Sequence, residues 1–266
     1  MKKSVRSKKN NLKIAAIFIT VIFFLIFISF LLKLIVLFKD SKFDGEHRFT
    51  VAVIKDDNAQ VISFSPENKT ISLLDVDGRV ENIGSFLKVP IDAFIYSNDL
   101  NIDRSNISSS FFKEMFNLGD NHKGVTVIDL FRLSYAARSL PLTSVYEKKI
   151  SKEDDELRVN SLINSFFTDQ NILSEKKRIQ IVNGTEVSGA GSRLASVINN
   201  MGGDVILVLS SDKEEDRSRV IYFGDKSYTV KKIASLLGFP IEEGKVKSIA
   251  DVIIVIGKDK ISEFRY

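Results

Sequence analysis

The sequence predicts an α/β (α+β) protein with one N-terminal transmembrane helix, then an α/β domain, then a small β-α-β-β-α-β domain at the C-terminus. The first observation behind this prediction is an apolar stretch of membrane-spanning length near the N-terminus. The second is that strand patterns precede helical stripes in the middle of the chain. The third is that short apolar strands alternate with capped helices over the last third. The hydrophobic fraction of 44% is enough for buried cores, which excludes a wholly disordered chain.

The apolar stretch covers residues 14–38 and is interrupted by Thr20, Ser29 and Lys33 alone. A helix rises ~1.5 Å per residue, so this length crosses a hydrocarbon layer of ~30 Å. The alternative is a cleaved signal peptide, whose apolar core runs about 7–15 residues and ends at a small-residue site. No such site follows here, so the sequence predicts an uncleaved transmembrane helix.

Charge distinguishes the two sides of this helix. Seven of the 38 basic residues lie before Lys39 in a stretch without acids, so the rest of the chain carries 31 basic against 34 acidic side chains. The basic tail 1–13 predicts a cytoplasmic N-terminus. A polar stalk at 39–48 then leads to an extracytoplasmic body on the cell membrane. The mildly acidic balance of that body argues against nucleic acid as a partner.

Cysteine and histidine usage removes several kinds of site. Cysteine is absent, which excludes disulfides, Cys–Zn sites and a thiol nucleophile. His47 and His122 are the two histidines. They are too few for a His-rich metal centre, and they support no Ser-His-acid arrangement.

The α/β domain is predicted over residues 49–175. Strands are expected at 49–54, 60–64 and 70–76. The charged stretch 147–156 is expected as a loop or the start of a helix.

Two helices are expected between the strands and this charged stretch. The first has Ser108 or Ser109 as a possible cap, and the second begins after Thr126 and ends before Pro141. Their apolar faces are expected to pack in the core. The side chains of these faces are Phe111, Phe112, Met115 and Phe116 on the first helix, and Val127, Leu130 and Phe131 on the second.

The C-terminal domain is predicted over residues 177–260. Its two helices have Ser188 and Ser227 as possible caps. The run 205–209 is uninterrupted and apolar, which is typical of a strand buried on both faces. The order of elements is that of split βαβ folds. The expected strands are 179–182, 205–209, 220–223 and 252–256.

The start of the first helix in this domain is a candidate ligand-binding site. Asn183, Gly184 and Thr185 form a turn ahead of it, and Arg193 can supply a positive charge to an anion at the helix N-terminus. The alternative, which the sequence favours, is a tight turn with close helix packing. The stretch 189–194 begins like a dinucleotide-binding loop but lacks its third Gly.

Acidic residues flank the strands of the first domain. Asp75, Asp77 and the Lys55-Asp56-Asp57 cluster offer hard oxygen ligands that suit a divalent cation. Acidic turn residues are far more often simply solvated. The sequence therefore predicts no metal site and no cofactor.

Residues 178–258 resemble the C-terminal domain of LytR–CpsA–Psr proteins. Three stretches carry the resemblance: IQIVNGTEVSGAGSRLASVINNMGGDV, RVIYFGDKSYTVKKIASLLG and ADVIIVIGKD. They hold a strand, an Asn-Gly-Thr turn, a Gly-containing helix start and a closing apolar strand in the family's order. The resemblance implies a protein of the bacterial cell envelope.

Residues 49–145 more distantly resemble the catalytic domain of the same family, through VISFSPENKTISLLDVDG and VPIDAFIYSNDL. In the family this domain transfers a glycan phosphate from a polyprenyl carrier to the cell wall, using Mg²⁺, Asp and Arg residues. Here Lys55 stands where the family has Arg, and Asp77-Gly78-Arg79 replaces Pro-Arg-Asp. Because phosphoryl transfer depends on positioned positive charge, these departures predict a degenerate, non-catalytic domain over 49–175.

Two functions follow from this resemblance. The favoured one is a non-catalytic binding or scaffold role in cell-wall or surface-glycan assembly. Its partners would be membrane lipid around the one helix and an envelope glycan or envelope protein. The alternative is a phosphotransferase that attaches lipid-linked glycan to the cell wall. In that alternative Asp57, Asp75 and Asp77 hold Mg²⁺, while Arg79 and Lys55 grip pyrophosphate.

Overall fold

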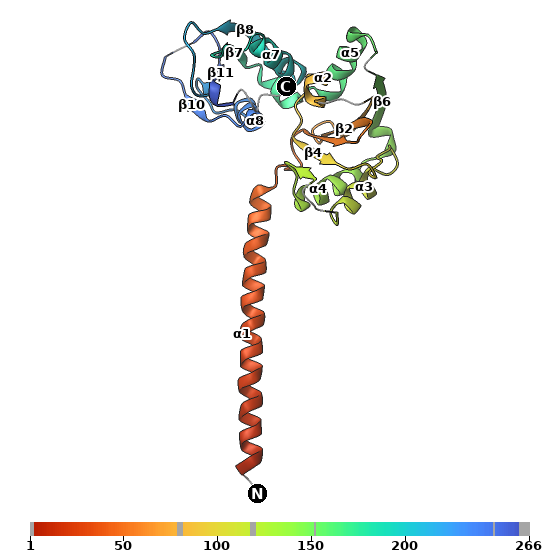
Figure 1. Cartoon of the computed structure of the whole chain (residues 1–266), viewed down its shortest axis with the longest axis vertical. Helices are drawn as coiled ribbons and strands as arrows, with labels where there is room; N and C mark the ends of the chain where they lie inside the picture. The colour runs from red at the N-terminus through yellow and green to blue at the C-terminus, as the bar shows by residue number, and fades with distance from the viewer. Residues whose placement is uncertain (1–2, 79–81, 118–120, 152, 247, 261–266) are drawn as a thin grey trace.

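The computed structural model describes residues 3–78, 82–117, 121–151, 153–246 and 248–260. Figure 1 shows one long helix, α1, that leads into a body made of two α/β units. α1 spans Lys3–Asp40, and its part from Ala15 to Asp40 is long and apolar enough to cross a membrane. The described side chains between Ala15 and Phe38 are exposed, and Phe38 at the end of this part lies beside Arg132 of the body. The mixed α/β class that the sequence predicts is confirmed.

The first unit is built on a six-stranded mixed sheet. Its centre is a meander in which β1, β2 and β3 pair antiparallel. β4 lies parallel to β1, β6 lies parallel to β3, and β5 closes the edge beside β4. In spatial order the strands are β5 (His122–Lys123), β4 (Ala93–Tyr96), β1 (Phe49–Ile54), β2 (Asn58–Ser65), β3 (Thr70–Asp77) and β6 (Val145–Ser151).

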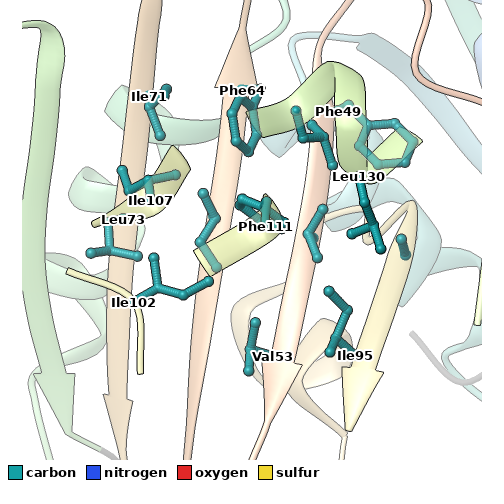
Figure 2. Packing of buried hydrophobic residues seen from close by; sticks show 14 of the residues in the cluster. Phe49, Val53, Phe64, Ile71, Leu73, Ile95, Ile102, Ile107, Phe111 and Leu130 are labelled. Atoms are coloured by element: carbon teal, nitrogen blue, oxygen red, sulfur yellow. The ribbon is translucent and has the colours of Figure 1, made fainter. Parts of the chain in front are cut away.

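Helices cover both faces of this sheet. Successive side chains of a strand point to opposite faces, and nearly every position of β1, β2 and β3 is buried, so each face must be covered. Figure 2 shows the core on one face, where the ring of Phe111 meets that of Phe64 edge-on with centroids 5.6 Å apart. The helices are α3 (Ile107–Glu114) and α4 (Val127–Arg138) on that face, and α2 (Ile83–Leu87) and α5 (Glu156–Phe167) on the other.

The second unit is a five-stranded mixed sheet in the predicted β-α-β-β-α-β order, with one short extra strand, β10. Three helices pack on it around Ile172, Leu194 and Ile233. In spatial order the strands are β10 (Ile241–Glu243), β9 (Arg219–Tyr222), β11 (Val252–Ile256), β7 (Arg178–Asn183) and β8 (Asp204–Ser210). The helices are α6 (Gln170–Glu175), α7 (Ala190–Asn200) and α8 (Tyr228–Leu237), and the short 3₁₀ turns of the chain are η1 (Leu142–Ser144) and η2 (Lys258–Lys260).

Two predictions that concern edge strands are wrong in part. The charged stretch 147–156 is expected as a loop or the start of a helix, and α5 does begin at Glu156, but residues 147–151 belong to β6. β6 is an edge strand that buries Val145 and Ile150 while the positions between them face solvent, so charge was compatible with a strand. The run 205–209 lies in β8, which is the edge of the second sheet and is largely exposed instead of buried on both faces.

The aromatic faces are core only in part. On α3 the buried stripe contains Ile107 and Phe111, at i and i+4. Phe112 and Phe116 fall off this stripe and are exposed, as Phe131 is on α4. The expectation that all of these aromatic side chains pack in the core is therefore wrong.

Among the predicted helix caps, Thr126 is confirmed. Its hydroxyl accepts a hydrogen bond from the backbone N–H of Asp129 at 3.2 Å, and the Asp129 carboxylate accepts one from the backbone N–H of Thr126 at 2.8 Å. Ser188 and Ser227 do not cap their helices. α7 begins after Gly189, and Ser227 precedes α8 without a capping bond from its hydroxyl.

Candidate functional site

The segment 41–48, expected as a stalk, packs onto the first unit. Phe43 is buried in the core, and the side chain of Arg48 is 7% exposed. The carboxylate of Asp129 accepts hydrogen bonds from the backbone N–H groups of Lys42 and Phe43, each at 2.8 Å. These contacts fix the approach to β1 and hold Arg48 against the sheet.

A polar pocket of about 570 Å³ opens beside Arg48. Its walls come from the β2–β3 turn, from β3 and β6, from the last residues of α5 and from the start of α6. This volume lies within the range of small-molecule sites. We call it the polar pocket, and the lining side chains used below are Arg48, Asn68, Ser72, Tyr146, Asn164 and Gln170.

Arg48 contributes the buried charge of the polar pocket. Its guanidinium donates hydrogen bonds to the Ser63 hydroxyl at 2.9 Å, to the Phe166 carbonyl oxygen at 2.6 Å and to the Ser65 hydroxyl. Burial lowers the pKa of Arg48, and the Glu67 carboxylate 3.7 Å away acts in the opposite direction. The Nε of Arg48 and the Oε2 of Glu67 are buried and have no partner within the described residues, so the pair keeps one donor and one acceptor unused.

Three carboxamides stand around the polar pocket without protein partners. Across the described parts of the chain, the side chains of Asn68, Asn164 and Gln170 make no hydrogen bond. The ring of Tyr146 on β6 is half exposed beside them. Each amide offers donors and an acceptor, and a tyrosine ring offers an apolar surface with a polar end. The arrangement of these side chains therefore suits a hydroxyl-rich ligand.

The candidate catalytic residues lie at a different place. Lys55, Asp75 and Asp77 line one pocket of about 150 Å³, together with Asn101 and Lys149. Asp57 is exposed and does not line this pocket, and Arg79 lies outside the described residues. The structure thus brings together two of the three predicted acids.

Both acids of this pocket are already paired. The Asp75 carboxylate accepts a hydrogen bond from Gln60 Nε2 at 2.6 Å, and the Asp77 carboxylate lies 2.9 Å from Lys149 Nζ. Burial lowers the pKa of Lys55, although the Asp75 charge acts in the opposite direction. Over the residues that the structure describes, no three His, Cys, Asp or Glu side chains converge as metal ligands. These donors do not fit a Mg²⁺ site.

Asn183 stabilises the turn that leads from β7 to α7. Its side-chain oxygen accepts hydrogen bonds from the backbone N–H and the hydroxyl of Thr185, and its amide donates to the Val187 carbonyl oxygen at 3.0 Å. Gly184 donates from its backbone N–H to the Ile256 carbonyl oxygen at 2.9 Å. Arg193 is exposed and reaches the start of its own helix at Ser188. The polar atoms of Asn183 are thus occupied, while the Arg193 guanidinium stays accessible.

An apolar pocket of about 580 Å³ lies at the start of the first unit. It is lined by the aromatic side chains of Phe43, Phe64, Phe131 and Tyr135, and also by the side chain of Arg132. It is large enough for part of a lipid chain, but it is separate from the pocket of Asp75 and Asp77. Among the residues that the structure describes, no apolar tunnel is therefore combined with the candidate catalytic acids.

Sequence reasoning missed the polar pocket because its side chains come from six separate segments of the chain. Arg48 lies in the expected stalk, and Tyr146 directly precedes the charged stretch that was expected as a loop or helix start. The one available signal was a cluster of carboxamides between residues 160 and 171.

Comparisons with known proteins bear on the second unit. The family model LytR_C, described as LytR cell envelope-related transcriptional attenuator, matches residues 176–259. A search of curated proteins found no match. The solved structure of the Lin1025 protein from Listeria innocua is similar at a TM-score of 0.34 and 13% identity, covering 46% of this chain and 97% of that chain. A likeness at that level does not establish a shared fold.

The LytR_C match covers nearly the same residues as the resemblance seen in the sequence. It implies a role related to the cell envelope, and the apolar helix α1 is compatible with anchoring in a membrane. The C-terminal part of the chain, residues 176–259, is thus a LytR_C domain.

Proposed function

We propose that this chain is a membrane-anchored, extracytoplasmic protein of the bacterial cell envelope that binds an envelope glycan without catalysing its transfer. The observation that carries this proposal is the polar pocket, in which exposed carboxamides without a partner among the described residues and a half-exposed tyrosine ring surround a buried arginine. The LytR domain supports the envelope setting, and α1 with its basic tail supports the anchor and its orientation.

The chemistry of the polar pocket matches that of a sugar. A sugar ring presents hydroxyl groups that both donate and accept hydrogen bonds, as Asn164 and Gln170 do. Its apolar C–H face can pack on the ring of Tyr146. Arg48 adds a charge that would favour a glycan carrying a phosphate or carboxylate group.

The pairing of the candidate acids supports a non-catalytic role. A carboxylate oxygen of Asp75 accepts a hydrogen bond from Gln60, and one of Asp77 pairs with Lys149. Asp57 does not line the same pocket. Stabilising a phosphoryl-transfer transition state requires convergent positive charge. Lys55 and Lys149 are the cations lining this pocket within the described residues, and Lys149 is paired with Asp77.

Binding is tested on the full chain in lipid nanodiscs, with purified wall-glycan fragments as the probe and calorimetry as the readout. We expect Asn164→Ala and Tyr146→Ala each to weaken binding by about threefold to tenfold, the value of one hydrogen bond or one ring contact. The matched controls are Asn121→Ala and Tyr96→Ala, which alter exposed side chains away from the polar pocket. Equal affinity of all four variants and the parent would contradict the proposal.

The two alternative functions, binding of an envelope protein and phosphotransfer, predict different results. If the partner is an envelope protein, the nanodisc sample binds no glycan, and crosslinking in cells gives a specific protein adduct at Tyr146. If the chain is a phosphotransferase, it turns over a polyprenyl-pyrophosphate glycan with Mg²⁺. That turnover would have to fall in Asp75→Ala and Asp77→Ala.

A further inference from the structure

The helices α3 and α4 expose large apolar side chains on the side turned away from the sheet. Their buried sides pack on the sheet, so their exposed side chains must point outward. We call these side chains, with two that follow the helices, the apolar face: Phe112 (48% exposed), Phe131 (52%) and Tyr135 (68%) on the helices, Phe116 (78%) two residues after α3, and Leu142 (57%) in η1 four residues after α4. Apolar side chains gathered on one layer in this way mark an interaction site more often than scattered ones do.

The charges on this layer have one sign. In α3 and α4, both fully within the described residues, the exposed charged side chains are Lys113 and Arg138. The two acids of these helices are buried. Glu114 lies 2.9 Å from His122, and Asp129 accepts backbone hydrogen bonds. Aromatic side chains next to Lys and Arg, without exposed acids, are typical of helices that lie in the interface of a bilayer.

The end of α1 is attached to this same layer. Arg132 on α4 donates hydrogen bonds to the Phe43 carbonyl oxygen at 2.7 Å and to the Ser41 hydroxyl at 3.1 Å. Its guanidinium also lies 5.8 Å from the ring centre of Phe38, at the end of the apolar part of α1. Arg132 therefore stands at the level where α1 leaves the hydrocarbon layer.

Phe131 and Tyr135 lie within one helical turn of Arg132. Three residues of α-helix advance only ~4.5 Å along the axis, so these rings are held close to the level of Phe38. In Figure 1, α3 and α4 form the part of the body nearest to α1, and both sheets lie beyond them. The apolar pocket between Phe43 and Phe131 continues the same surface.

We infer that the apolar face rests on the membrane surface, with its aromatic rings in the headgroup region and Lys113 and Arg138 at anionic headgroups. The inference rests on the proposed function through the membrane anchor α1. It adds that the body is docked on the bilayer by a second contact. The polar pocket lies beside α5, which packs on the other face of the first sheet, so this contact leaves it open to the envelope.

The absence of cysteine makes a direct test possible. Single variants Phe112→Cys and Tyr135→Cys, in the full chain, carry a fluorophore and are reconstituted in vesicles of phosphatidylcholine and phosphatidylglycerol. Quenching is measured with nitroxide attached to the lipid chains and, separately, with iodide in water. The matched control is Tyr146→Cys, whose parent side chain is similarly exposed on β6. A label at Phe27→Cys in α1 reports whether the anchor is inserted.

We expect labels at positions 112 and 135 to be quenched by the lipid nitroxide at least about threefold more than the label at 146, and iodide to give the reverse order. Labels at 112 and 135 that behave like the label at 146, while the label in α1 is quenched by lipid, would overturn the docking and leave the anchor intact. A protein partner for the apolar face gives this same result in pure lipid. A label in α1 that iodide quenches would overturn the anchor and the docking together. Unchanged melting temperatures of the labelled variants show that the fold is retained.

Discussion

Arg132 donates a hydrogen bond of 2.7 Å from its guanidinium to the carbonyl oxygen of Phe43. This bond joins α4 to the chain that has just left α1. Beside it, Asp129 accepts from the Ser41 hydroxyl at 2.7 Å and from the backbone N–H of Lys42. α1 is thus joined to the body by hydrogen bonds instead of a free linker.

The first prediction concerns this joint. Asp129→Ala should destabilise the first unit by roughly 2–3 kcal/mol, because it removes a buried carboxylate that serves several donors and leaves them unpaired. Thermal unfolding of the full chain measures the loss. Asp204→Ala, at an exposed position on β8, is the matched control and should change little. Equal melting temperatures of the two variants would contradict the claim that the hydrogen bonds of Asp129 stabilise this junction.

The second prediction concerns the contact between the two units. Lys232 Nζ on α8 lies 2.8 Å from the Asp92 carboxylate and also donates to the Arg48 carbonyl oxygen at 3.0 Å. Because both side chains of the pair are largely buried, Lys232→Met should cost roughly 2–5 kcal/mol. A double-mutant cycle with Asp92→Asn in chemical unfolding should recover part of this cost. Additive single effects would show that the two charges are not coupled.

The third prediction is a pH dependence at Glu175. Its carboxylate accepts hydrogen bonds of 2.9 Å from the backbone N–H groups of Tyr228 and Thr229, so it caps α8 from a different helix. Burial opposes ionisation, but these hydrogen bonds outweigh it and hold the pKa of Glu175 below its usual range. Its contribution, roughly 0.3–1 kcal/mol after screening, is present above the ordinary Glu pKa of about 4.3 and is lost as the pH falls through the lower native pKa.

Stability measured by chemical unfolding at a series of pH values checks this dependence. Glu175→Gln should flatten the curve between about pH 4.5 and pH 3. Glu153→Gln, at an exposed position before α5, should leave its shape unchanged. A parent curve that Glu175→Gln does not alter would mean that Glu175 stays equally charged in the unfolded and folded chain.

The fourth prediction concerns the turn of the LytR domain. A Cβ added at Gly184 would lie 2.4 Å from Glu215 Cβ and 2.9 Å from the Ile256 carbonyl oxygen. Gly184→Ala should therefore destabilise the second unit by about 1–3 kcal/mol. Gly84→Ala is the control, because its nearest contacts would be 3.5 Å or more and Ala favours a helix over Gly. Comparable stability of the two variants in thermal unfolding would contradict this prediction, because it would show that the turn can rearrange to accommodate a Cβ at position 184.

The sequence could predict the elements that carry their own periodicity or capping signals. The strand 49–54, the helix after Thr126 and the β-α-β-β-α-β order of the C-terminal domain are all found in the structure. β6 and β8 were misjudged because burial of an edge strand depends on its neighbours, which a local pattern does not reveal. The exposure of Phe112 could not be predicted for a related reason. Four aromatic or apolar side chains close together on a helix do not reveal which of them face the sheet.

The candidate sites were harder to predict than the fold. β3 carries Asp75 and Asp77 on the same side, so both line one pocket, whereas Asp57 does not. Gln60 and Lys149, which occupy their carboxylates, come from neighbouring strands whose register only the structure gives. The polar pocket depends on Arg48, Tyr146 and Asn164, which lie far apart in the chain and share no motif.

The orientation of the body tests the account most directly. Single variants Val246→Cys and Ser7→Cys are expressed in bacterial protoplasts and treated with a maleimide that cannot cross membranes. Position 246 is highly exposed on the second unit, and position 7 lies in the basic tail. The account predicts that cysteine 246 is labelled in intact protoplasts and cysteine 7 only after lysis. Labelling of cysteine 7 in intact protoplasts, with cysteine 246 protected until lysis, would contradict it.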